Sequence, residues 1–363
     1  MKIAIVGTRG IPARYGGFEA CAEKLSIGLV KKGYKVYVFC RKYLYPERLK
    51  EYKGVNLIYL PSLKGKFTDT FSHTFLSIIF SLFKNPDIIF VFNSANSPLC
   101  ILPKILRKKI VINVDGLEWK RKKWNWFGKI YYKFCEFFSC FISDEIITDS
   151  KIIQNYYKIK FGKQTTYIPY GADFFISKNK DVLEKYGLKE YQYFFNGSRI
   201  EPENNQDLII KAFSLVKTEK NMVFVGKTYY RSKYFEKLKK IKDERIKFLG
   251  PIYSSDYDEI MATCYAYIHG NEVGGTNPAL LKAMGSRRCI LAIDVPFNRE
   301  VLDDCGIYFK DVNDLKEKIE FLIKNQEIVK ELEEKVKKRA EKLYRWENVI
   351  DDYERILLKW AKK

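Results

Sequence analysis

The stretch GTRGIPARYGGFEA, residues 7–20, decides the fold of the first half of the chain. It follows the apolar, β-branched run KIAIV at 2–6, which predicts a buried strand. After it, apolar residues recur at helical spacing, and Gly33 stands where the C-terminal cap of that helix is expected. The stretch therefore joins a strand to a helix.

A strand-to-helix corner of this kind suits a phosphate. Its glycines let the backbone come close to a ligand, and the first amides of the helix present partial positive charge. Arg9 and Arg14 favour an anion site over a plain glycine turn. The spacing is not G-x-G-x-x-G, and the next strand, 35–40, ends at Arg41 instead of an acidic residue. The sequence therefore disfavours NAD and gives little support for NADP.

Short apolar runs alternate with helical patterns along the chain, which predicts parallel α/β sheets. The stretch TTYIPYGAD at 165–173 interrupts the alternation with Pro and Gly, which indicates a domain boundary. We expect two doubly wound, Rossmann-like domains, residues 1–168 and 169–345, and 363 residues are enough for both cores. The expected strands are 2–6, 35–40, 55–60, 87–92, 110–114, 145–148, 191–195, 222–225, 246–249, 265–268 and 289–293.

The excess of positive charge predicts an anionic partner. The chain has 65 Lys and Arg against 44 Asp and Glu, a formal net charge of +21. Membrane lipid, nucleic acid and phosphorylated substrates all fit such an excess. The longest apolar stretch, 71–83, is too short and too interrupted to span a bilayer. It predicts a buried helix, with a helix lying on a bilayer as the alternative.

Cysteine and histidine usage excludes several classes of site. The eight cysteines are scattered without a C-x-x-C pair, which predicts reduced core residues and no zinc site. The chain has two histidines, so a histidine-rich metal site is excluded, and neither lies near a G-x-S-x-G elbow. No N-terminal signal peptide is expected, because the chain begins with a strand-like run.

Two motifs of the second half repeat the logic of the first. In HGNEVGGTNPALLKAM, which begins at residue 269, Pro278 fits a first helical turn and Asn277 or Thr276 fits the cap. Its glycines leave the helix-end amides uncovered, which predicts a second anion site. In FFNGSRIEPENN, from residue 194, Arg199 follows the C-terminal edge of a strand, where open α/β sheets bind ligands.

The stretch DGLEWKRKKW follows the strand 110–114 and carries two further candidates. Asp115 is expected at the carboxyl edge of the sheet, where it can orient a hydroxyl or take its proton. A turn-forming Asp–Gly is the alternative. The segment 119–124, WKRKKW, combines four cations with flanking tryptophans, which is typical of docking to a membrane interface or a lipid diphosphate. A solvated basic turn is the alternative there.

Taken together, these motifs resemble family 4 retaining glycosyltransferases of the GT-B fold, most closely their bacterial rhamnosyltransferase branch. The motifs run across most of the chain in the expected order, which makes the match specific to the branch. They are GTRGIPARYGGFE at 7–19, VDGLEWKRKKW at 114–124, IPYGAD at 168–173, GSRIEPENN at 197–205, VGGTNP at 273–278 and PFNREVL at 296–302.

The resemblance implies an α/β protein with two Rossmann-like domains facing a cleft, the acceptor on the N-terminal side and the sugar nucleotide on the C-terminal side. A final helix, about 346–363, would pack back on the first domain. It implies transfer of L-rhamnose from dTDP-L-rhamnose, with retention, to a sugar on a lipid diphosphate in cell-wall or capsular polysaccharide synthesis. It also implies a cytoplasmic protein peripherally associated with the inner face of the cell membrane, with no metal, no cofactor besides the substrate nucleotide sugar, and no nucleic-acid partner.

The resemblance also assigns site residues. Catalytic roles fall to Asp115 and Arg199, with the donor's own phosphate oxygen as an alternative base. The residues expected to bind the donor are Gly16, Gly17, Arg199, Asn204, Gly274, Gly275, Thr276, Asn277 and Lys282. The residues expected to meet the acceptor or the membrane are Arg9, Arg14, Glu118, Trp119, Lys120, Arg121, Lys122, Lys123 and Trp124.

The chain departs from the family pattern at two positions. Relatives usually carry glutamates where this chain has Gly274 and Lys282, and the second glutamate contacts the nucleotide ribose. Lysine offers no acceptor for a ribose hydroxyl. A catalytically degenerate protein that binds membrane or partners, or a transferase that uses another nucleotide sugar, is therefore the alternative. A basic nucleic-acid-binding protein ranks last, because RRM, KH and helix-turn-helix signatures are missing.

Overall fold

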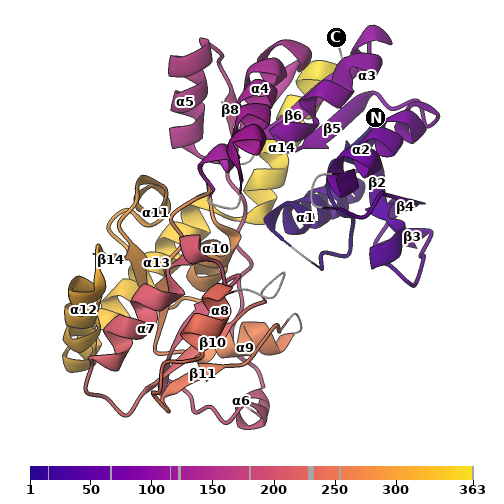
Figure 1. The fold of residues 1–363 in the computed structure, drawn as a ribbon. Coiled ribbons are helices and arrows are strands. Elements are labelled where there is room, and N and C mark those ends of the chain that lie inside the picture. Colours follow the sequence, from indigo (N-terminus) through magenta and orange to yellow (C-terminus); the bar gives the residue numbers. More distant parts are fainter. Residues whose placement is uncertain are drawn as a thin grey trace. The chain divides into compact units, whose positions relative to one another are not determined.

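The chain folds into two compact units (Figure 1). A computed structural model describes residues 1–14, 16–65, 68–114, 116–121, 124–179, 181–227, 233–252 and 255–361. The first unit comprises Met1–Tyr170 together with Trp346–Lys363, and the second comprises Gly171–Arg345. The chain thus passes between the units after Tyr170, where the sequence places the division after residue 168, and returns after Arg345.

The first unit is built on an eight-stranded sheet in the order β3-β4-β2-β1-β5-β6-β7-β8. Every neighbouring pair is parallel except β3 with β4. The central strands are buried along almost their whole length, as expected of a parallel sheet covered on both faces. The strands are β1 (Lys2–Val6), β2 (Lys35–Arg41), β3 (Glu51–Tyr52), β4 (Val55–Leu60), β5 (Ile88–Phe92), β6 (Lys109–Val114), β7 (Glu145–Thr148) and β8 (Thr166–Tyr167).

The direction of the connections sorts the helices of the first unit onto two faces. The chain leaves β1 through α1 (Gly17–Lys31) toward β2, whereas from β4 onward it moves the other way across β5, β6, β7 and β8. Because such crossovers are right-handed, α1 covers one face and the later helices cover the other. Those later elements are α2 (Thr68–Leu82), η2 (Ser94–Cys100), α3 (Ile101–Ile105), α4 (Trp126–Ile142) and α5 (Lys151–Phe161).

The C-terminal helix α14 (Trp346–Ala361) belongs to the first unit, where it packs on α1 beside β5 and β6. The fully buried Tyr353 hydroxyl accepts a hydrogen bond from Asn113 Nδ2 at 2.7 Å. Gly28 lets the two helices approach, since a Cβ there would stand 2.4 Å from Ile350 Cδ1. Outside this contact, Glu354 pairs with Lys32 Nζ at 2.7 Å. The helix therefore completes one face of the first sheet.

The second unit has a six-stranded, all-parallel sheet in the order β11-β10-β9-β12-β13-β14. Its strands are β9 (Tyr193–Gly197), β10 (Asn221–Val225), β11 (Ile246–Phe248), β12 (Ala266–His269), β13 (Ile290–Ile293) and β14 (Ile307–Phe309). Its helices are α6 (Asp181–Lys185), α7 (Gln206–Ser214), α8 (Lys233–Leu238), α9 (Ser255–Thr263), α10 (Pro278–Gly285), α11 (Pro296–Leu302), α12 (Val312–Lys324) and α13 (Gln326–Leu343). Aromatic and aliphatic side chains of β9, β10, β12 and β13 fill the core against α7 and α12.

The α/β prediction with two Rossmann-like domains is confirmed, and all eleven expected strands are present. The eight cysteines are buried and free, as expected of core residues. The expected helix over 71–83 is α2, but only one side of this helix is buried as predicted. His73 and Ser77 are buried, whereas Phe71, Phe75 and Phe83 are exposed. Within the described residues, no helix is both long and apolar enough to cross a membrane.

Candidate functional site

Each sheet reverses its strand order beside a glycine-rich corner. In the first unit the order turns between β1 and β5, and the loop 7–16 leaves β1 at that point. In the second unit it turns between β9 and β12, which the loops 198–205 and 270–277 follow. Open α/β sheets bind ligands at the carboxyl ends of strands where the order reverses. The quoted corner motifs thus lie at the switch point of their own unit.

The corner of the first unit is folded tightly against the strand ends. Gly10 has φ +112°, and a Cβ there would lie 2.6 Å from the Cys40 side chain. The Arg41 amide donates to the Arg9 carbonyl at 3.0 Å. Gly16 is the N-cap of α1 and supplies no side-chain cap, and Gly17 is the first helical residue. The loop is therefore held in place by β2 while the start of α1 has no side-chain cap of its own.

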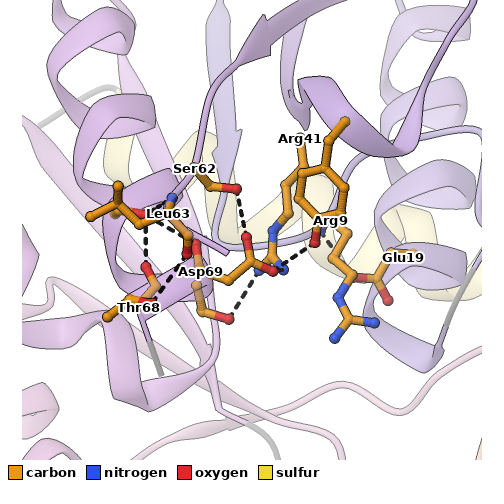
Figure 2. Close-up of polar contacts among 10 residues, drawn as sticks. Arg9, Glu19, Arg41, Ser62, Leu63, Thr68 and Asp69 are labelled. Carbon is orange, nitrogen blue, oxygen red and sulfur yellow. Dashed lines mark hydrogen bonds and ion pairs between the residues drawn. The ribbon is translucent and has the colours of Figure 1, made fainter. Parts of the chain in front are cut away.

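Two loop amides of this corner already bind carboxylates. Glu19, which is 6% exposed, accepts the Arg9 amide on Oε1 at 2.9 Å (Figure 2). Glu23, one turn later, accepts the Ala13 amide on Oε2 at 2.6 Å. The sequence prediction assigned the first amides of the helix to a phosphate and did not consider these two glutamates. A carboxylate at a helix N-terminus offsets part of the positive charge that the helix presents there.

The two arginines of the loop differ in their surroundings. The Arg14 side chain is exposed and lies over the Tyr45 ring, with its Cζ 5.1 Å from the ring centroid. Its Nη1 also donates to the Leu44 carbonyl at 3.3 Å. Arg9 is half-buried beside Glu19 (Figure 2). Of the two, Arg14 is the more accessible to a ligand from solvent.

Arg41 has a structural role that the sequence did not indicate. Its guanidinium, at the end of β2, pairs with Asp69 of α2 at 2.5 Å and is 3% exposed (Figure 2). Asp69 also accepts hydrogen bonds from Ser62 Oγ at 2.6 Å and from the Tyr43 hydroxyl at 2.8 Å. This network holds the start of α2 at the carboxyl edge of the sheet, beside the loop 7–16. Arg41, which stands where dinucleotide-binding folds carry an acidic residue, thus stabilises the corner.

The basic segment after β6 is only partly available to a ligand. Asp115, Lys122 and Lys123 lie outside the described residues. Glu118 and Arg121 are buried and form an ion pair with each other. The expectation that Arg121 meets a membrane or acceptor is therefore corrected, because its charge is neutralised inside the unit.

The tryptophans of the segment lie among cations and polar groups of the same unit. Glu118 Oε2 accepts a hydrogen bond from Trp124 Nε1 at 3.2 Å. The Trp119 ring has the ammonium groups of Lys120, Lys133 and Lys160 at 5.7, 4.6 and 5.9 Å from its centroid. Lys120 is exposed, whereas Lys133 comes from α4 and Lys160 from α5. The basic cluster thus includes two lysines that sequence proximity did not reveal.

In the second unit the α10 corner forms as expected. Asn277 is the N-cap of α10, its Oδ1 accepts the Ala279 amide at 2.9 Å, and Pro278 begins the helix. The cap prediction is confirmed, although one helix-end amide is thereby used by the protein itself. Thr276 and Gly275 are buried. At Gly274, an added Cβ would meet nothing within 4 Å, so the corner is open on that side.

The loop after β9 presents Arg199 and holds it by its backbone. The Arg199 carbonyl accepts hydrogen bonds from Asn204 Nδ2 at 2.6 Å and from Gln206 Nε2 at 2.8 Å. Its guanidinium is 35% exposed and lies 3.5 Å from Glu201. Asn204 is 4% exposed, and its side-chain amide holds the Arg199 backbone in place. The donor-binding role expected for Asn204 stays a prediction, and the structure adds a positioning role.

Lys282 is engaged within its own unit. Its Nζ pairs with Asp258 of α9 at 2.5 Å and lies 4.7 Å from the centroid of the Tyr257 ring. The Tyr257 hydroxyl donates to the Gly197 carbonyl at the end of β9. Lys282 and Asp258 thus bring a paired positive and negative charge close to the switch point. The sequence pattern did not point to Asp258, whose carboxylate lies beside Lys282.

His269 is a further residue of this edge that the sequence motif contained but did not single out. It ends β12, is fully buried, and its Nδ1 lies 3.4 Å from the Tyr267 hydroxyl. Among the described residues, Nε2 has no hydrogen-bond partner. Burial lowers the pKa of His269 to about 3, so the imidazole is neutral at physiological pH. The described residues include no group of three or more His, Cys, Asp or Glu side chains arranged to hold a metal ion.

Two Rossmann-like domains with glycine-rich corners at their switch points define a protein of the GT-B fold class. Residues 179–343 match the family described as Glycosyl transferases group 1, and residues 1–173 match a domain of unknown function, DUF1972. The second unit is therefore a Glycosyl transferases group 1 domain. No curated protein matches the chain in sequence.

Solved structures share the fold over almost the whole chain. Sucrose-phosphate synthase from Thermosynechococcus elongatus has a TM-score of 0.81 at 16% identity, covering 99% of this chain and 98% of that chain. Anabaena HepE, in complex with UDP and glucose, has a TM-score of 0.79 at 16% identity, covering 99% and 100%. WaaG, a glycosyltransferase involved in lipopolysaccharide biosynthesis, has a TM-score of 0.74 at 15% identity, covering 97% and 99%. At these identities the likeness establishes the fold.

Proposed function

We propose that the protein is a retaining glycosyltransferase that uses a nucleotide sugar, with L-rhamnose from dTDP-L-rhamnose as the transferred sugar. The acceptor is a sugar on a lipid diphosphate, in cell-wall or capsular polysaccharide synthesis. The observation that carries the proposal is the edge of the second sheet, where the N-terminus of α10 and Arg199 follow the adjacent strands β12 and β9. The structurally similar HepE was solved in complex with UDP and glucose, which supports a nucleotide-sugar ligand for a protein of this fold.

The chemistry follows from charge development. As the bond between the anomeric carbon and the diphosphate oxygen breaks, negative charge grows on the leaving diphosphate. Arg199 and the backbone amides at Gly275 and Thr276 provide positive potential there without reorganising, which lowers the barrier. The acceptor hydroxyl forms the new bond on the same face of the sugar. Its proton goes to Asp115 or to the departing phosphate oxygen.

The first test is transfer by the full chain. It is incubated with dTDP-L-rhamnose and a lipid-diphosphate sugar, in parallel with UDP-glucose, and the product is separated by chromatography. Arg199→Ala is expected to lower the rate by about 10²–10³-fold, because one stabilising contact to developing charge is lost. Arg355→Ala, whose side chain is 74% exposed on α14, is the matched control and is expected to leave the rate unchanged.

The outcomes separate the candidate functions. Product from dTDP-L-rhamnose supports the proposed donor, and product from UDP-glucose alone replaces it with another nucleotide sugar. Loss of product in Asp115→Asn supports Asp115 as the base, whereas full activity of this variant assigns that role to the donor phosphate. Nucleotide binding without any product would instead favour a degenerate, membrane- or partner-binding protein. The ion pair that occupies Lys282 is the observation that keeps this second function in the test.

A further inference from the structure

Helix α4 exposes an apolar stripe on the side that faces away from the core. Its inner side packs Tyr132, Cys135 and Ser139 into the first unit. Its outer side carries six large apolar side chains that are between 48% and 67% exposed: Trp126, Phe127, Ile130, Phe134, Phe137 and Phe141. A helix that is apolar on both sides is normally enclosed by protein or lipid. Soluble surfaces rarely leave such a contiguous apolar stripe uncovered.

Neighbouring helices of the same layer also expose large apolar side chains. α2 exposes Phe71 and Phe75, and α3 exposes Ile105. The segment η2 packs against α2, α3 and α4, so these helices form one continuous layer on the same face of the sheet. On the other side of α4, the Phe137 ring lies 6.1 Å from Phe161 of α5. The apolar surface is thus a property of the whole layer.

This layer displays no free carboxylate. The helices α2, α3, α4 and α5, whose residues the structure describes in full, contain two acidic residues, Asp69 and Glu136. Asp69 pairs with the buried Arg41. Glu136 is 3% exposed and accepts a hydrogen bond from the Tyr156 hydroxyl at 2.8 Å. An anionic partner therefore meets no unpaired carboxylate on these helices.

Lysines border the stripe on α4 itself. Lys133 is exposed between Ile130 and Phe134, and its ammonium belongs to the cluster around Trp119 with Lys120 and Lys160. Aromatic side chains interleaved with lysines match the two layers of an anionic bilayer surface, because rings enter the acyl boundary while ammonium groups bind phosphates. Each cation near such a surface adds attraction.

We propose that the outer face of α2, α3 and α4 docks on an anionic lipid bilayer, with α4 lying in the interface and its aromatic stripe inserted. A second copy of the chain fits this face less well, because a two-fold contact would oppose the lysine clusters of both copies. The proposal rests on the lipid-linked acceptor of the proposed function and adds the surface that binds the membrane. It does not depend on which sugar is transferred.

Binding to vesicles of phosphatidylglycerol and phosphatidylcholine in equal parts tests the surface by co-sedimentation. The full chain is expected to bind, and added salt is expected to weaken binding by screening the lysines. Phe134→Ser/Phe137→Ser is expected to weaken the partition at least about tenfold, since each ring loses burial in the interface. The matched control is Phe321→Ser/Leu343→Ser in the second unit, where both side chains are similarly exposed. It is expected to leave binding unchanged.

A second measurement detects insertion of the stripe in the unmodified chain. Brominated acyl chains are expected to quench tryptophan fluorescence in the unmodified chain, and Trp126→Phe is expected to remove most of that quenching. Equal partition of both serine pairs, or no quenching, overturns the proposal. A lipid-free dimer that Phe134→Ser/Phe137→Ser dissociates also overturns it, in favour of a second copy. Transfer to a water-soluble acceptor is measured separately. A chain that binds vesicles but transfers no sugar contradicts the proposed function and leaves the docking surface supported.

Discussion

Two histidines occupy fully buried positions, one in each unit. His73 lies on α2 and His269 ends β12. Burial, with a contribution from the nearby Arg41 charge, lowers the pKa of His73 to about 4. Burial alone lowers that of His269 to about 3. An unfolded histidine has a pKa near 6.5 and therefore binds its proton at higher pH than these buried histidines do. Both side chains thus favour unfolding as the pH falls below about 6.5.

We therefore predict that His73 makes the first unit sensitive to acid. Stability is lost as the pH drops from about 6.5 to about 4, and one histidine contributes about 3 kcal/mol over this window. His73→Phe is expected to make the unfolding transition of the first unit less dependent on pH, as measured by calorimetry. His269→Phe is the control, because it should alter the second unit only. An unchanged slope for His73→Phe would contradict the prediction.

At the scale of elements, α10 shows how a short sequence builds a binding corner. Asn277 caps the helix with its own Oδ1, Pro278 begins it, and Gly274 leaves the approach open. The cap stabilises the helix, and the remaining amides and the helix dipole favour negative charge at the same end. Stability therefore depends on the acceptor oxygen of Asn277, whereas ligand binding depends on the charge at the same end of the helix.

Two substitutions of Asn277 separate these properties. Asn277→Ala is expected to lower the unfolding free energy of the second unit by about 1 kcal/mol, because the Ala279 amide loses its acceptor. Asn277→Asp keeps an acceptor and is expected to preserve stability, but its charge repels a diphosphate and weakens nucleotide binding about tenfold. Calorimetric unfolding and nucleotide titration measure the two effects. Tight nucleotide binding by Asn277→Asp would argue against a diphosphate at this corner.

At the scale of the whole molecule, the chain leaves the first unit and returns to it. The helix α14 lies at the end of the sequence, yet it fills one face of the first sheet and buries Tyr353 against Phe90 and Asn113. Trp360 Nε1 also donates to Glu145 of β7 at 2.9 Å. The first unit is therefore complete only after the second has been synthesised.

This arrangement predicts a long-range effect of changes in α14. Tyr353→Ala is expected to destabilise the first unit by about 3–5 kcal/mol, since a large buried ring is lost. Tyr353→Phe is expected to cost about 1–2 kcal/mol, because the Asn113 amide loses its partner. The transition of the second unit should not move in either variant. A shift of the second transition, or a comparable loss from the exposed Arg355→Ala, would contradict this assignment.

Much of the fold could be predicted from the sequence because its signals are local. Buried parallel strands read as short apolar runs, and turns are marked by Gly and Pro. The strand 2–6, the loop 7–16 and the cap at Asn277 all depend on residues within a few positions of each other. Candidate residues such as Arg199 could be found for the same reason, since they directly follow a strand end.

The remaining features depend on residues that are distant in sequence. Periodicity predicted that the helix over 71–83 is buried, but only the layer of α2, α3 and α4 decided that its phenylalanines stay exposed. The basic composition of the segment 119–124 predicted that Arg121 is a surface cation, whereas the folded protein buries it against Glu118. The sequence also did not reveal that the Asn204 side chain holds the Arg199 backbone.

The sequence by itself determined the two parallel α/β domains, their glycine corners and the excess of positive charge. These follow from the local rules of hydrophobic pattern, turn chemistry and charge count. The tertiary structure alone decided which charges are neutralised inside the protein, as with Arg41 and Asp69, and which apolar side chains remain open on α4. Burial and pairing are set by contacts between distant segments, and one-dimensional patterns carry no information about those contacts.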